Sequence, residues 1–147
     1  MRCTDEYGPI GYGWTYSAHP IGAAAGVANL KLVDSLNLLQ NAEGTGAYLR
    51  SELQAALGDH PHLGEVRGEG LLIAVEFVEN RDQRQFFDPA KKVGPTLAAN
   101  LLKEGIIARA MPQGDILGFA PPLCISQGEA DQIVQGMRNA VKATFDA

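Results

Sequence analysis

Apolar positions follow a helical period from Ile21 onward. They recur every three or four residues, at Ala25, Ala28, Leu32, Leu36 and Leu39. This is the spacing of an amphipathic helix. Pro20 suits the first position of that helix, because its missing N–H would have no partner there in any case.

The helical pattern continues further along the chain. A similar stripe is formed by Leu49, Leu53 and Ala56. Gly44 and Gly46 lie at the junction of the two stripes. The pattern predicts two consecutive helices, or one long kinked helix, ending near Gly58. Pro61 then stops any continuation.

The period changes to two in the segment VRGEGLLIAVEFVEN, residues 66–80. One set of alternating positions is apolar and consists of Leu71, Ile73, Val75 and Phe77. The other set consists of Leu72, Ala74 and Glu76. Such alternation predicts a strand. Gly68 and Gly70, just before it, indicate a bend or a close approach of the backbone.

Shorter elements follow. Residues 95–105 read as a helix that Gly105 ends, and residues 106–111 and 115–120 as two short strands. Ser126 and Glu129 form an S-x-x-E capping box that opens a last helix. One face of that helix carries Ala130, Val134, Met137, Val141 and Phe145. We therefore predict an α+β fold, in which helices pack on one face of a three-stranded, mainly antiparallel sheet.

Composition narrows the classes of function. The chain has 147 residues and a net charge of −5, so it lacks the basic surface of a general nucleic-acid binder. It has no apolar run of about 18 residues, and we predict no membrane-spanning helix. Cys3 and Cys124 are far apart and lack metal-ligand spacing. They suit reduced thiols in a cytoplasmic protein, and a single disulfide stays open as an alternative.

Residues 11–20, GYGWTYSAHP, stand directly before the first predicted helix. Free N–H groups and the positive end of a helix dipole favour phosphate or carboxylate at such a point, and Thr15 or Ser17 would add a hydroxyl donor. Ordinary helix capping by the same residues is the alternative. Ser17 and His19 are also the residue types of a nucleophile and its base, but no G-x-S-x-G elbow is present. We favour a capping serine beside a packed or solvated histidine.

Two arginines and two histidines are further candidates. Arg109 lies between apolar residues on a short predicted strand, where it either faces solvent or binds a carboxylate. Arg67 has the same two interpretations, and spacing alone favours solvent for both. His60 and His62 flank Pro61 without a third ligand partner, so we predict no metal site.

Three segments together resemble a known family. GWTYSAHPIGAAAGVANL, VRGEGLLIAVEF and GIIARAMPQGDILGFAPPLCIS follow one another as in the C-terminal portion of class III aminotransferases. The likeness is greatest to the ω-transaminases, which include the β-alanine:pyruvate type. It runs from about Tyr12 to Phe145. Ala18 stands where the family more often has glycine.

The resemblance implies a chemistry and an assembly. Members of this family are fold-type I homodimers that use pyridoxal 5′-phosphate (PLP). They exchange an amino group between an amine or ω-amino acid and a keto acid such as pyruvate. Thr15 matches a threonine that reaches the cofactor phosphate of the neighbouring subunit, and Trp14 beside it would line that site. Arg109 matches an arginine that binds the substrate carboxylate.

The resemblance also implies that a part is missing. The family's cofactor-binding lysine lies upstream of the threonine motif. The lysines of this chain fall on predicted helices or in polar loops, namely Lys31, Lys91, Lys92, Lys103 and Lys142. We therefore expect no catalytic residue here. Residues 1–20 would be a loop leading from a missing PLP-binding domain, and residues 21–147 the small C-terminal domain with its leading long helix. Such a fragment would be inactive alone. A stand-alone α+β small-molecule-binding or regulatory domain is the alternative, and a small hydrolase using Ser17 and His19 a more distant one.

Overall fold

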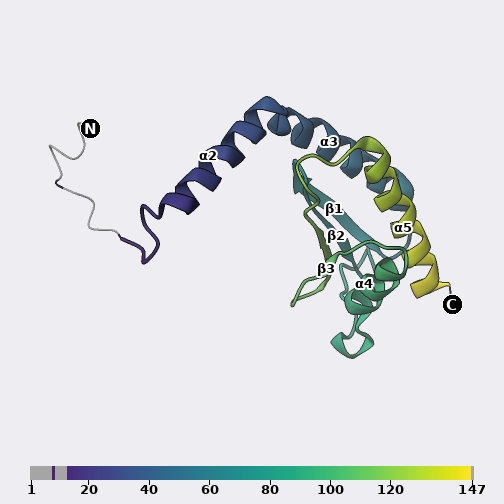
Figure 1. Cartoon of the computed structure of the whole chain (residues 1–147). Helices are drawn as coiled ribbons and strands as arrows, with labels where there is room; N and C mark the ends of the chain where they lie inside the picture. The colour runs from purple at the N-terminus through teal and green to yellow at the C-terminus, as the bar shows by residue number, and fades with distance from the viewer. Residues whose placement is uncertain (1–7, 9–12, 147) are drawn as a thin grey trace. The chain divides into compact units, whose positions relative to one another are not determined.

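A computed structural model describes residue 8 and residues 13–146 of the chain (Figure 1). The chain divides into two compact units, residues 1–36 and residues 37–147. Tyr12, where the family resemblance begins, and Cys3 lie outside the described residues.

The first unit contains the helix α2, Pro20–Ser35. Pro20 occupies the first turn, as the sequence predicts, and no residue of the helix is buried. The side chain of His19 is the N-cap: its Nδ1 accepts a hydrogen bond from the backbone N–H of Gly22 at 3.5 Å. The expected capping by Ser17 is therefore wrong, because the histidine one residue before Pro20 takes that place.

Two helices form, as one of the predicted alternatives has it. The second, α3, runs from Leu38 to Leu57 and ends at Gly58. The break between the helices falls at Asn37, whose φ of 51° is left-handed. Asparagine tolerates this conformation better than most residues. The break does not fall at Gly44 and Gly46, which lie inside α3.

The sheet of the second unit has four strands in the order β1-β2-β4-β3, and every neighbouring pair is antiparallel. The strands are β1 Leu63–Glu69, β2 Leu72–Phe77, β3 Arg109–Ala110 and β4 Asp115–Phe119. The predicted three strands become four because residues 66–80 form most of a hairpin instead of one strand. Gly70, with a φ of 52°, lies in the turn between β1 and β2.

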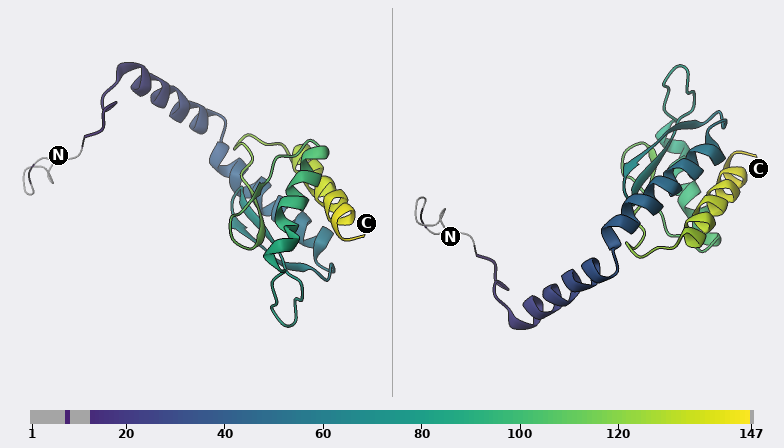
Figure 2. Two further views of the ribbon diagram at one scale, coloured as in Figure 1. Left: turned by 90° about the horizontal axis from the view of Figure 1, so that it is seen from below. Right: turned by 90° about the horizontal axis from the view of Figure 1, so that it is seen from above.

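Three helices pack on one face of this sheet, as predicted. They are α3, α4 (Val93–Lys103) and α5 (Gln127–Phe145), and Figure 2 shows α5 beside α3 and α4. A short 3₁₀ turn, Pro89–Lys91, precedes α4. The core joins the apolar face of β2 to all three helices through fully buried side chains, including Leu49, Leu53, Val75, Phe77, Leu97, Leu101 and Met137.

The predicted end of α4 and the predicted start of α5 are confirmed, whereas α4 begins at Val93, two residues before the predicted start. Gly105, after α4, has a φ of 78°, a conformation that glycine adopts without strain. Ser126 caps α5 with the full capping box. The carboxylate of Glu129 accepts hydrogen bonds from the backbone N–H and the hydroxyl of Ser126 at 2.8 and 2.7 Å. These bonds lower the pKa of Glu129.

One close approach holds α3 against the hairpin. Gly46 is buried in α3, and a Cβ added there would lie 2.1 Å from the carbonyl oxygen of Gly70. The obstacle is backbone, so it cannot rotate away. The glycine therefore lets the helix reach the β1–β2 turn, and nearby Arg50 donates a hydrogen bond to the carbonyl of Gly68 at 2.6 Å.

We expect Gly46→Ala to destabilise the second unit by about 1–3 kcal/mol or more, the usual cost of overpacking. Gly44→Ala is the matched control, because its added Cβ meets nothing within 4 Å in the same helix. That variant should be neutral or more stable by up to about 1 kcal/mol. Urea unfolding followed by circular dichroism measures both. Equal stabilities for the two variants would contradict the close contact.

Candidate functional site

The sheet face away from the helices carries a row of four residues in register. Arg67 on β1 pairs with Ala74 on β2, Ala74 with Gly118 on β4, and Gly118 with Arg109 on β3. Side chains directly opposite one another in a sheet lie on the same face. All four line one open groove of about 460 Å³. Two arginines therefore stand at the ends of the row, and two small residues form its floor.

Arg67 is already engaged by carboxylates. Its Nη1 donates hydrogen bonds to Glu76 at 2.5 Å and to Glu65 at 3.1 Å. The hydrogen bond with Glu76 is the main cause that raises the pKa of Arg67. Two negative charges thus surround one guanidinium. This end of the groove has no surplus positive charge to offer a ligand.

Arg109 differs from Arg67 in this respect. It is exposed on the edge strand β3, and within residues 13–146 no hydrogen bond or ion pair engages its side chain. A guanidinium presents a planar fork that matches a carboxylate in two parallel hydrogen bonds. The structure thus separates the two arginines that their spacing in the sequence left equal. Arg109 is the candidate for binding an anion.

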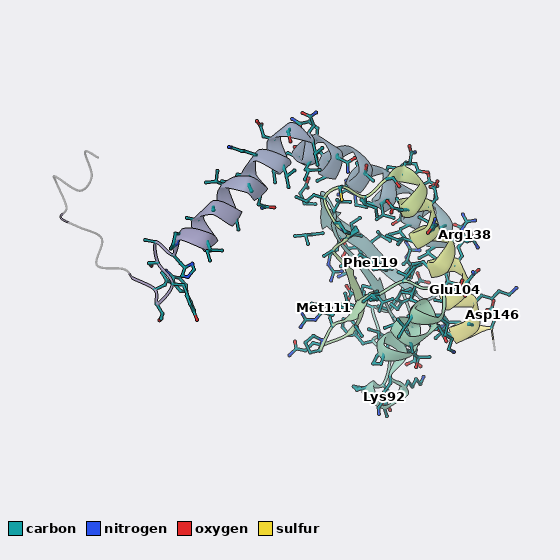
Figure 3. The ribbon with its side chains drawn as sticks, viewed as in Figure 1. Lys92, Glu104, Met111, Phe119, Arg138 and Asp146 are labelled. Atoms are coloured by element: carbon teal, nitrogen blue, oxygen red, sulfur yellow. The ribbon has the colours of Figure 1, made fainter. Side chains whose placement is uncertain are left out.

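Apolar side chains border the groove between the arginines. Leu72 on β2 is 69% exposed, and Met111 follows β3 (Figure 3). The backbone N–H of Met111 donates to the carbonyl of Ile116 at 2.9 Å, which holds this residue beside β4. The groove therefore offers one uncommitted cation next to an apolar surface.

The turn before α2 holds the other predicted site residues. The hydroxyl of Ser17 accepts a hydrogen bond from the backbone N–H of Trp14 at 2.9 Å. Thr15 and Trp14 are both exposed, and Trp14 remains 69% accessible. Ala18 has a φ of 60°, in the left-handed region that favours glycine. These residues belong to the first unit, and Arg109 belongs to the second.

Ser17 and His19 have separate structural roles. The serine hydroxyl closes the turn at Trp14, and the histidine Nδ1 caps α2. No hydrogen bond joins Ser17 to His19 in the described part of the chain. The geometry gives no support to a nucleophile and base at these positions.

His60 and His62 belong to an aromatic cluster at the end of α5. The ring of His62 stacks on Phe145 at 4.7 Å between centroids, and that of His60 lies 5.1 Å from the same ring. Burial is the main cause that lowers the pKa of His60. Across the residues that the structure describes, no group of three or more His, Cys, Asp or Glu side chains is placed to hold a metal ion.

The lysines all lie on the surface. Each of the five is exposed. Lys91 is paired with Glu79, and Lys103 donates to the side-chain oxygen of Asn100 at 2.9 Å. A lysine that reacts with a carbonyl compound at neutral pH is usually desolvated, which lowers its pKa. The five lysines described here are exposed instead.

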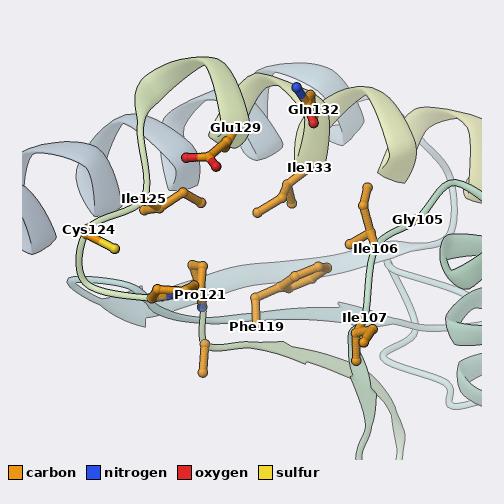
Figure 4. Close-up of a pocket in the computed structure, with 12 residues that line it drawn as sticks. Gly105, Ile106, Ile107, Phe119, Pro121, Cys124, Ile125, Glu129, Gln132 and Ile133 are labelled. Atoms are coloured by element: carbon orange, nitrogen blue, oxygen red, sulfur yellow. The ribbon is translucent and has the colours of Figure 1, made fainter.

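A second cavity of about 500 Å³ lies between the start of α5 and the segment after β4 (Figure 4). Its walls are mainly apolar and include Ile106, Phe119, Ile125 and Ile133. The carboxylate of Glu129 at its rim is used in the capping box. Cys124 contributes an exposed free thiol. This cavity suits an apolar group rather than acid–base chemistry.

Sequence reasoning missed the floor of the sheet groove. Ala74 and Gly118 read as ordinary strand residues, and their pairing depends on strands 44 residues apart in sequence. The one available signal was that small residues occupy the open face, where polar or large side chains are usual. That signal gains meaning only when the register is known.

Comparison with known proteins gives the family. The model of the family "Aminotransferase class-III" matches residues 3–141, almost the whole chain. The chain belongs to the class III aminotransferases. The resemblance seen in the sequence is thereby confirmed.

Individual relatives agree with this membership. The chain is 54% identical over 144 residues to a diaminobutyrate–2-oxoglutarate transaminase of Halomonas elongata, covering 98% of this chain and 31% of that protein. It is 33% identical to a putrescine–pyruvate aminotransferase of Pseudomonas aeruginosa, and the match covers 100% of this chain and 32% of that protein. The chain thus spans about a third of the length of the curated relatives it matches.

Solved structures show the same fold. A thermostable (S)-enantioselective ω-transaminase from Thermomicrobium roseum matches with a TM-score of 0.85 and 39% identity, over 94% of this chain and 30% of that one. A transaminase obtained by ancestral reconstruction matches with a TM-score of 0.90 and 56% identity, over 97% of this chain and 31% of that one. The α+β architecture is that of fold-type I PLP-dependent transaminases. Among the described residues, no helix is long and apolar enough to cross a membrane.

Proposed function

We propose that this chain is the C-terminal part of a PLP-dependent aminotransferase that moves an amino group between an amine or ω-amino acid and a keto acid such as pyruvate. One observation carries the proposal: a chain of this family presents an uncommitted arginine, Arg109, in an open groove. The names of the two relatives above, which include diaminobutyrate and putrescine, point to donors with a terminal amino group.

Arg109 would bind the carboxylate of the keto acid or amino acid. It is exposed, it carries a permanent charge, and no carboxylate of the described chain neutralises it. Its place on a two-residue edge strand leaves the long side chain free to turn toward a ligand or aside from one that lacks a carboxylate. This would allow one site to accept both kinds of substrate.

Thr15 and Trp14 would contribute to the cofactor site of a neighbouring subunit in a homodimer. The exposed hydroxyl of Thr15 and the start of α2 suit a phosphate group. The fit is to that end of the cofactor only, because every lysine here is exposed. When bound, PLP supplies the electron sink for the exchange of the amino group. Residues of this chain would hold the phosphate, line the site and bind the carboxylate.

The organisation of the whole protein is part of the proposal. Residues 1–20 would lead from an upstream PLP-binding domain, and residues 21–147 would form the small domain with its leading helix. The acidic composition and the free thiol of Cys124 support a cytoplasmic protein without a nucleic-acid partner. The cavity of about 500 Å³ is what favours the alternative, a domain that binds a small molecule by itself.

We expect the 147-residue chain to lack transaminase activity, because all five of its lysines are exposed, whereas a lysine that reacts with a carbonyl compound is usually desolvated. The chain is mixed with PLP, reduced with borohydride and analysed by peptide mass spectrometry, and turnover is assayed in parallel. The complete Halomonas elongata enzyme serves as the positive control. A stoichiometric adduct at one lysine together with turnover would show that the chain is a complete catalyst.

A chimera tests the role of Arg109. This chain replaces the segment that it matches in the Halomonas elongata enzyme, and the chimera should transaminate. Arg109→Gln should then lower kcat/KM for pyruvate by about 10–100-fold, since a hydrogen bond to a charged group contributes about 1.5–3 kcal/mol. Activity toward propanal, which has no carboxylate, should change by less than about threefold on the same reasoning.

Arg67→Gln is the matched control for this variant. It removes the same charge from the other end of the same row, where Glu65 and Glu76 already engage it. It should lower the melting temperature and leave the ratio of pyruvate to propanal activity unchanged. The proposal fails if Arg67→Gln changes that ratio as much as Arg109→Gln does.

Thr15 is tested in the same chimera through its affinity for PLP. Thr15→Val keeps the shape of the side chain and removes the hydroxyl, so the dissociation constant of PLP should rise about tenfold or more. Thr15→Ser, which keeps the hydroxyl, should restore the affinity to within about threefold on the same grounds. Absorbance titration of the apoenzyme measures both. Unchanged affinity in Thr15→Val would remove Thr15 from the site.

A further inference from the structure

We propose that Gly118 is a specificity-determining residue: the space above its backbone takes the carbon chain of the substrate whose carboxylate Arg109 holds. The inference deepens the function proposed above and rests on it. The class of ligand is a 2-oxo acid with one carboxylate and a short aliphatic chain, or the amino acid that corresponds to it.

Register places Gly118 next to Arg109. The two residues are direct partners on β4 and β3, and Ala74 on β2 is the next partner in the same row. Adjacent strands lie about 4.8 Å apart, so the row from Arg109 to Arg67 spans about 14 Å. A carbon chain that leaves the carboxylate along this row passes over Gly118 and then over Ala74. Neither residue has a large side chain, so the groove lies over these two positions.

The backbone does not require a glycine at this position. Gly118 is absent from the glycines with a positive φ, and an added Cβ would meet only the Sδ of Met111 at 3.5 Å and the carbonyl of Arg109 at 3.7 Å. Both distances are ordinary van der Waals contacts. A glycine inside a strand costs about 0.5–1 kcal/mol relative to alanine. The glycine therefore leaves space above the strand and is not needed for the backbone conformation.

The residues around the groove determine which kind of substrate carbon chain fits there. Leu72 and Met111 present apolar surface beside the floor. At the far end, the charge of Arg67 is matched by Glu65 and Glu76, whose carboxylates disfavour a second carboxylate there. One carboxylate at Arg109 followed by an aliphatic chain fits these walls. A dicarboxylate extended along the row would bring its second charge against two glutamates.

The chimera described above allows a direct test with Gly118→Ala and Gly118→Val. Values of kcat/KM are measured for pyruvate, 2-oxobutanoate and 2-oxopentanoate. We expect Gly118→Val to lower the ratio of 2-oxopentanoate to pyruvate by about tenfold or more, since one methylene in an apolar site is worth about 10–200-fold. Gly118→Ala should shift the ratio in the same direction by less. Dissociation constants of unreactive propanoate and pentanoate, measured by calorimetry, should follow the same order.

Gly128→Ala is the matched control, because it adds the same methyl group to α5 where nothing lies within 4 Å. It should leave the ratio unchanged. A folded chimera that does not transaminate would contradict the proposed function. An active chimera in which both Gly118 variants keep the parent's ratio, or lose activity equally on all three acids, would overturn the role of Gly118. Gly118→Ala decides the matter if the valine variant does not fold.

Discussion

The register between β2 and β4 is the constraint on which the second unit depends. Ile73, Val75 and Phe77 lie under the helices only because Val75 stands opposite Leu117 in this pairing. A slip of one residue would turn every side chain to the opposite face. The same register sets Ala74 beside Gly118 on the open face, so one alignment fixes both the core and the groove. The close contact of Gly46 with Gly70 then holds α3 across the hairpin that begins this alignment.

The two arginines that this register places on one face differ in the charges around them. Arg67 has the carboxylates of Glu65 and Glu76 within hydrogen-bond distance, whereas Arg109 lies at the opposite edge without a described partner. The charge available to a ligand is therefore at one end of the groove only. A ligand with one anionic end and one apolar end matches this asymmetry. The polarity of the groove thus arises from the pairing of β1 with β2 as much as from Arg109 itself.

Sequence patterns predicted the elements whose chemistry is local. The apolar alternation of β2 and the capping box of α5 depend on neighbouring residues, and both are confirmed. The strand β1 was missed because its glycines and charged residues hide the alternation. The break at Asn37 was missed because leucines flank it on both sides, while Gly46 suggested a break and instead serves a contact 24 residues away. From the residue pattern alone, without the family resemblance, Arg67 could not be told from Arg109, since Glu76 reaches Arg67 only once the hairpin has formed.

The exposed surfaces of this chain follow from what it contributes to the proposed enzyme. A residue that binds a substrate carboxylate must stay uncommitted in the free chain, and Arg109 does so only because no carboxylate of β2 or β4 faces it in the row. Alanine and glycine occupy those facing positions. A glutamate at position 118 would pair with Arg109 as Glu76 pairs with Arg67, and its side chain would fill the groove. The small residues of the row therefore leave the charge of Arg109 unpaired and keep space for a ligand beside it. Binding a substrate needs both the charge and the space.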